Sequence, residues 1–122
     1  MLGAAILLGC LAMTGQASSS PRPCPGALAH WELAAAVPAH VPQMKNVLRV
    51  MDDGRLEWNG SDNVTKDNVR QYLEIITTMG PQPLMVLTYG AKAPCNEVTR
   101  ARALIEEVLQ CEAGECLEVP AS

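Results

Sequence analysis

The chain has 122 residues and a net charge of −4 at pH 7, and 48% of its residues are hydrophobic, with no phenylalanine among them. This length fits one domain, since domains commonly contain about 100–150 residues. The mild acidity excludes the basic field that attracts nucleic acid or an anionic membrane surface. We therefore expect one small domain with a thin core and no nucleic-acid partner.

The first residues form an apolar segment. Residues 2–13 are almost all apolar, and small residues follow up to and beyond Ala17. This order is typical of a secretory signal, and the segment is shorter than the roughly 20 apolar residues that cross a bilayer. We predict a signal peptide over residues 1–17, cleaved near Ala17, and a periplasmic or secreted protein. Two alternatives stay open: an uncleaved anchor over residues 2–17, and a lipid on Cys10.

Four cysteines remain after removal of the signal, which indicates two disulfides in an exported chain. They are Cys24, Cys95, Cys111 and Cys116. A helix over residues 96–110 would hold Cys95 and Cys111 about 24 Å apart, beyond the limit of about 7 Å for bridged residues. A Cys95–Cys116 bridge would require the tail to run straight back along that helix. We therefore predict the disulfides Cys24–Cys95 and Cys111–Cys116.

Residues 18–45 are a proline-rich leader and linker. The prolines and serines of residues 18–27 disfavour regular structure. Residues 27–37 predict a short helix that ends before a proline. The leader's two histidines, His30 and His40, have no acid or nucleophile beside them in the sequence, so we expect partly exposed linker residues without a catalytic role.

Residues 46–60 predict a β-hairpin. Asp53-Gly54 supplies the positive φ angles of a tight turn. After this turn Leu56 and Trp58 alternate with charged residues, so one face of the second strand is expected to be buried. The polar residues 59–63 then predict a turn.

Residues 65–79 predict an amphipathic helix with Thr65 as its N-cap, and Gly80-Pro81 ends it. Its inward face is expected to comprise Val69, Tyr72, Leu73, Ile76 and Met79. The apolar run 84–89 predicts a strand buried on both faces and parallel to one strand of the hairpin.

A second helix is expected over residues 96–110. On its flank, Arg102 and Glu106 are four residues apart and predict an exposed ion pair. The residues expected to face inward are Val98, Ala101, Ile105, Val108 and Leu109. Residues 117–119 predict a last short strand.

The predicted fold is α+β, a small two-layer sandwich of order β-β-α-β-α-(β). Its mixed sheet is expected to have three to four strands, with two helices on one face. The folded domain is expected over residues 46–119, and residues 120–122 form a tail.

The segment from Asp53 to Gly60, DGRLEWNG, resembles a hairpin of the periplasmic domain of the ExbD/TolR family of biopolymer-transport proteins. The resemblance continues through the helix residues 69–73, the strand 84–89 and the helix core 98–105. It implies an envelope protein whose domain forms homodimers and contacts an envelope protein or peptidoglycan.

The chain departs from this family in its apolar segment. The family's motor activity depends on a membrane-embedded aspartate, whereas the first acidic residue here is Glu32. The resemblance therefore implies a version of the domain that lacks the motor's proton carrier. Contact with a membrane is expected only indirectly, or through an uncleaved N-terminal segment.

Catalytic patterns are absent from the sequence: it has no Ser-His-Asp order, phosphate-binding glycine loop, paired histidine ligands or C-x-x-C motif. We expect no enzyme activity, no metal and no cofactor. The expected function is binding in the periplasm, with Trp58, Asn59 and Tyr89 as the candidate interaction surface. The alternative is a small secreted, disulfide-stabilised binding or inhibitor protein, unrelated to transport, that presents the loop 111–116 to a target.

Overall fold

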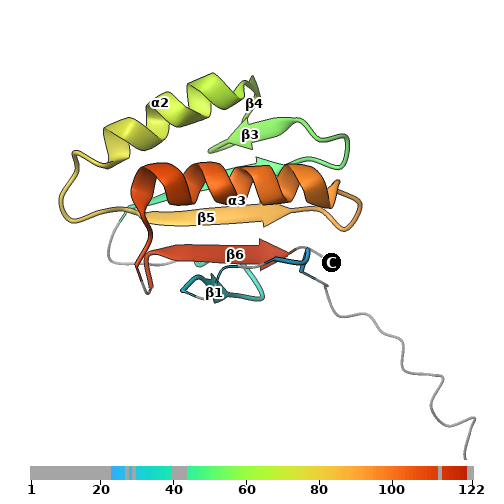
Figure 1. Cartoon of the computed structure of the whole chain (residues 1–122), viewed down its shortest axis with the longest axis horizontal. Helices are drawn as coiled ribbons and strands as arrows, with labels where there is room; N and C mark the ends of the chain where they lie inside the picture. The colour runs from blue at the N-terminus through green and yellow to red at the C-terminus, as the bar shows by residue number, and fades with distance from the viewer. Residues whose placement is uncertain (1–22, 27, 29, 40–43, 113, 121–122) are drawn as a thin grey trace, which may run out of the picture.

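The structure is a computed structural model that describes residues 23–26, 28, 30–39, 44–112 and 114–120. Six strands form one sheet in the order β1-β6-β5-β2-β3-β4, and both helices lie on one face of it (Figure 1). The elements are β1 (Glu32–Leu33), β2 (Lys45–Val50), β3 (Leu56–Trp58), β4 (Ser61–Val64), α2 (Lys66–Ile76), β5 (Leu84–Tyr89), α3 (Cys95–Leu109) and β6 (Cys116–Pro120). The predicted signal peptide, Cys10 and His40 lie outside the described residues. Among the residues that the structure describes, no helix is both long and apolar enough to span a membrane.

The predicted α+β class is confirmed, but the sheet has six strands where three to four were predicted. One added strand is β4, which lies in the segment predicted to be a turn. Asn59 and Gly60 adopt φ angles of 49° and 88°, so the chain reverses within two residues and returns alongside β3. The turn is therefore shorter than predicted, and its polar residues extend the hairpin into a third strand.

The other added strand is β1, which replaces the short helix predicted over residues 27–37. Glu32 pairs with Leu117 in parallel register, and the N–H of Ala34 donates to the carbonyl of Glu118 at 2.9 Å. The open edge of β6 supplies these hydrogen bonds. Pairing with a distant strand therefore overrides the weak helical preference of this segment.

The central strands follow the predicted pattern. β2 and β3 are antiparallel, and the N–H of Met51 donates to the carbonyl of Arg55 at 2.8 Å across the turn. Gly54 has a φ of 89°, which a side chain would disfavour. β5 lies between β2 and β6, parallel to both, and all six of its residues are buried.

Helix α2 begins at the predicted cap. The hydroxyl of Thr65 accepts the N–H of Asn68 at 3.1 Å, and the side-chain oxygen of Asn68 accepts the N–H of Thr65 at 3.1 Å, which closes a capping box. The buried residues of the two helices follow the predicted stripes in part. Tyr72 and Val108 are only partly buried, Met79 lies beyond α2 and is exposed, and Arg102, predicted on an exposed flank, is buried. The buried set is Val69, Leu73, Ile76, Val98, Ala101, Arg102, Ile105 and Leu109.

Part of the second face of the sheet is covered by residues that follow β1. Leu84, Val86, Leu117 and Val119 form a small core there, and Ala34, Val37 and Val47 pack against it. Ala34 and Val37, which follow β1 in the chain, lie against this core. The described part of the leader is thus packed into the domain.

Both predicted disulfides are confirmed. Cys24 and Cys95 join the leader to the start of α3, with their Cα atoms 5.4 Å apart. Cys111 and Cys116 join the end of α3 to the start of β6, with their Cα atoms 5.8 Å apart.

Candidate binding sites

The predicted interaction surface of Trp58, Asn59 and Tyr89 is not one surface. Tyr89 is 2% exposed and lies in the core, so its assignment to a surface is wrong. Trp58 is half-buried and its ring stacks on that of Tyr72, with the centroids 5.2 Å apart. Asn59 is exposed, but its Oδ1 accepts the N–H of Val47 at 2.7 Å. Trp58 therefore packs β3 against α2, and Asn59 stabilises the hairpin.

The two edges of the sheet are poor sites for an added strand. β4 has four residues, its pairing with β3 shifts register between Leu56 and Glu57, and Asn63 has a φ of 63°. β1 has only two residues. Short and irregular edges resist pairing with another chain. A partner would therefore bind mainly to side chains.

A groove of about 400 Å³ runs between α2 and α3. The two helices are parallel to each other on the same face of the sheet (Figure 1). Each connects two strands that run in the same direction: α2 leads from β4 to β5, and α3 leads from β5 to β6. Side chains of both signs line the groove around a floor of Leu104 and Ala103. The lining residues are Lys66, Asp67, Arg70, Arg100, Ala103, Leu104 and Glu107.

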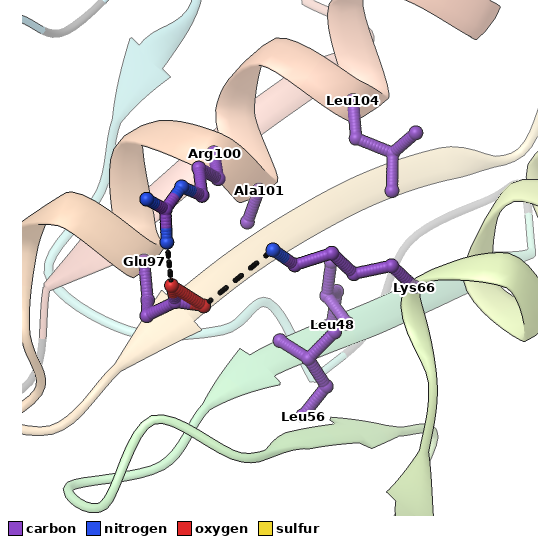
Figure 2. A pocket seen from close by; sticks show the side chains of 7 residues that line it. All are labelled: Leu48, Leu56, Lys66, Glu97, Arg100, Ala101 and Leu104. Carbon is purple, nitrogen blue, oxygen red and sulfur yellow. Dashed lines mark hydrogen bonds and ion pairs between the residues drawn. The ribbon is translucent and has the colours of Figure 1, made fainter.

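Ion pairs cross this groove at both ends. Arg70 Nη2 lies 2.6 Å from Glu107 Oε2. At the other end, Glu97 accepts from Arg100 and lies 3.8 Å from Lys66 Nζ. Figure 2 shows the Glu97 carboxylate between these two cations, in a small pocket that Leu48 and Leu56 also line. Because the three cations are exposed, their ion pairs are weak, and a charged ligand can exchange with them.

A buried polar network fixes the leader to the domain. Arg102 is 2% exposed and Glu118 is fully buried. Arg102 donates from Nε to Glu118 Oε1 at 2.7 Å and from Nη2 to Oε2 at 2.6 Å, and the Tyr89 hydroxyl donates to the same carboxylate. Arg102 also donates to the backbone carbonyls of Cys24 and Pro25, each at 2.6 Å. The N–H of Cys24 in turn donates to the Tyr89 hydroxyl at 3.0 Å.

The titration behaviour of this network fits a structural role. Burial, reinforced by the hydrogen bond to Glu118, raises the pKa of Tyr89 to about 12. The hydrogen bonds to Glu118 raise the pKa of Arg102 above its ordinary value. The phenol and the guanidinium thus keep their protons at neutral pH and are bonded inside the fold. We name Arg102, Glu118 and Tyr89 the leader clamp.

The prediction of an exposed Arg102–Glu106 pair is wrong. Arg102 faces the leader and β6, where it meets Glu118. Glu106 instead binds the leader: its Oε1 lies 2.6 Å from His30 Nε2 and its Oε2 accepts the indole N–H of Trp31 at 3.0 Å. Glu118 lies between Leu117 and Val119 in the last strand, and a glutamate between apolar residues indicates a buried, positively charged partner. The four-residue spacing of Arg102 and Glu106 did not reveal that Arg102 is this partner.

No cluster of three or more potential metal ligands occurs among the residues that the structure describes. A scan against models of known protein families finds no match to the chain, and a search of curated proteins finds no similar sequence.

Proposed function

We propose that the chain is a non-catalytic binding module of the bacterial envelope, an ExbD/TolR-like domain that acts in the periplasm in a biopolymer-transport context. The observation that carries this proposal is the order of elements from β2 to β6. A hairpin, an added strand β4, a helix, a strand, a second helix and a last strand follow one another. Apart from β4, this is the order that the resemblance leads us to expect. The two disulfides support an oxidising compartment, where such bonds persist.

The groove between α2 and α3 is the binding site of this proposal. It offers exposed cations, carboxylates and an apolar floor within one open space. Such a mixed lining suits a ligand that itself carries ammonium and carboxylate groups, as a peptide or the peptide part of peptidoglycan does. The partner is then peptidoglycan or a polar segment of an envelope protein, and a homodimer would present the groove twice.

Co-sedimentation with purified peptidoglycan tests the proposal, together with photo-crosslinking in intact envelopes. The photoreactive residue replaces Ala103, which lines the groove, or Ser61, an exposed residue of β4 that serves as the control. We expect sedimentation or a discrete adduct from position 103 and none from position 61. Replacement of Arg70 and Arg100 by alanine should weaken binding about tenfold, since two exposed charge pairs with the ligand are each worth up to about 1 kcal/mol.

The matched control for the charge change is Arg55→Ala, which removes an exposed arginine that pairs with Asp53 in the hairpin. Equal binding by the control and the double variant would contradict a role for the groove. Absence of both sedimentation and crosslinking, from a chain that is a monomer by sedimentation velocity, would contradict the whole proposal.

The loop between Cys111 and Cys116 distinguishes the alternative of a secreted inhibitor. The N–H of Glu115 donates to the carbonyl of Glu112 at 3.1 Å, and the carbonyl of Glu115 accepts the N–H of Met85 at 2.9 Å. The loop therefore serves as a turn into β6. Replacement of residues 112–115 by a neutral linker should preserve peptidoglycan or partner binding, whereas it would abolish the activity of an inhibitor that uses this loop.

A further inference from the structure

Three large apolar side chains are exposed at one end of the molecule. Met44, which precedes β2, is 68% exposed; Ile75, in the last turn of α2, is 57% exposed; and Met79, which follows α2, is 41% exposed. This is the end at which α2 and α3 finish and β2, β5 and β6 begin (Figure 1). Single exposed apolar residues are normal, but these three share one end of the fold with the C-termini of both helices.

Backbone hydrogen bonds hold the segments of this end together. The N–H of Leu84 donates to the carbonyl of Met44 at 2.8 Å, and the N–H of Met85 donates to the carbonyl of Glu115 at 2.9 Å. The start of β5 therefore lies between Met44 on one side and the Cys111–Cys116 loop on the other. Because Leu84 follows α2 after a short connection, Met79 and Ile75 lie at the same end.

The same end is acidic. Residues 71–91 and 103–120 contain no lysine or arginine, and neither α2 nor α3 has a basic residue in its last turn. The partial negative charge of both helix C-termini is therefore not offset there. Glu74 and Glu112 are exposed beside these termini and form no ion pair within the described part of the chain.

The charge of the nearby lysine lies on the other face of the sheet. Lys45 begins β2, and its ammonium group donates to the carbonyl of Pro38, which follows Val37 on the face opposite the two helices. Lys45 shares the helix-free face of the sheet with Val47, two residues on.

We name the set Met44, Glu74, Ile75, Met79 and Glu112 the acidic pole.

We propose that the acidic pole binds a basic amphipathic helix of another protein. Carboxylates and helix C-termini attract lysine and arginine side chains, while two methionines and an isoleucine accept apolar side chains of varied shape. The negative charge opposes an anionic lipid surface and the same pole of a second copy. This surface is separate from the groove, so the inference does not depend on the proposed function.

The test uses a synthetic helical peptide of leucine and lysine, with the leucines on one face at positions i, i+3, i+4 and i+7. The control peptide has the same composition in scrambled order. Fluorescence anisotropy at low salt measures the affinity of each peptide for the oxidised mature protein. We expect saturable binding of the amphipathic peptide, at least about tenfold tighter than that of the scrambled peptide.

Two double variants locate the binding surface. Ile75→Ser with Met79→Ser should weaken binding about tenfold, and Glu74→Gln with Glu112→Gln should weaken it severalfold and reduce its salt dependence. These residues are exposed, so the fold should persist, which circular dichroism verifies. Leu33→Ser is the matched control, because Leu33 is 55% exposed but belongs to β1, and it should leave binding unchanged.

Equal affinity for the two peptides would overturn the proposal. So would binding that both double variants leave unchanged, or that Leu33→Ser weakens as strongly as they do. Self-association of the protein that the Ile75→Ser and Met79→Ser changes abolish would identify a second copy as the occupant and would likewise overturn it.

Discussion

Replacement of Arg102 by methionine should destabilise the protein strongly. Methionine fills much of the same space but leaves the Glu118 carboxylate without two charge-assisted hydrogen bonds, and the carbonyls of Cys24 and Pro25 lose their donor. Removal of one partner from a buried ion pair costs about 3–5 kcal/mol. In a domain of this size each kcal/mol lowers Tm by about 4–8 °C, so we expect a decrease of at least about 12 °C.

Urea unfolding followed by circular dichroism, with both disulfides intact, measures the change in the free energy of unfolding. Arg100→Met is the matched control, because Arg100 is exposed on the same helix and its loss should cost less than about 1 kcal/mol. The double variant Arg102→Met, Glu118→Met should be more stable than the sum of its single changes predicts, by about 2 kcal/mol, because it removes both charges together.

A local measurement separates the leader from the rest of the fold. The N–H of Cys24 donates to Tyr89, which Glu118 holds in place, so hydrogen exchange at Cys24 should accelerate in Arg102→Met. A cost for Arg102→Met no greater than that for Arg100→Met, with exchange at Cys24 unchanged, would refute the reasoning that the clamp anchors the leader.

Two further predictions concern the disulfides and pH. Replacement of Cys24 and Cys95 by alanine should lower the free energy of unfolding by about 4 kcal/mol, and replacement of Cys111 and Cys116 should lower it by about 2 kcal/mol. The difference arises because the bridged residues are 71 and 5 positions apart, and the longer loop has more conformational entropy in the unfolded chain. The reverse order in urea unfolding would contradict this entropic account. The Tyr89 phenol, with its pKa raised to about 12, should stabilise the fold fully below about pH 10, where unfolded tyrosine is also protonated, and progressively less as the pH rises towards 12. Absorbance titration should place its ionisation near pH 12, and a Tyr89→Phe variant that loses stability over the same pH range as the wild type would show that another group is responsible.

Local chemistry explains what the sequence predicted well. The turn at Asp53-Gly54 and the capping box at Thr65 depend on residues within a few positions of each other. The cysteine pairing followed from helix length, since a rigid helix keeps Cys95 and Cys111 apart. Each of these features is decided before the chain forms its long-range contacts.

Long-range pairing explains what the sequence did not predict. β1 has two residues and exists because β6 presents an open edge, and no local pattern specifies that edge. The orientation of Arg102 was missed because its partner, Glu118, lies in another element. The run 84–89 was correctly predicted to be buried on both faces, and that prediction already conflicted with placing Tyr89 on an interaction surface.

The pairing of β1 with β6 has a consequence for biogenesis. Glu32 meets Leu117, which lies 85 positions further along the chain (117 − 32), so the sheet acquires its outermost strand only after β6 has formed. Contacts of such high sequence separation slow folding. A chain that folds as it emerges from its N-terminal end therefore keeps this edge of the sheet unpaired until β6 is available.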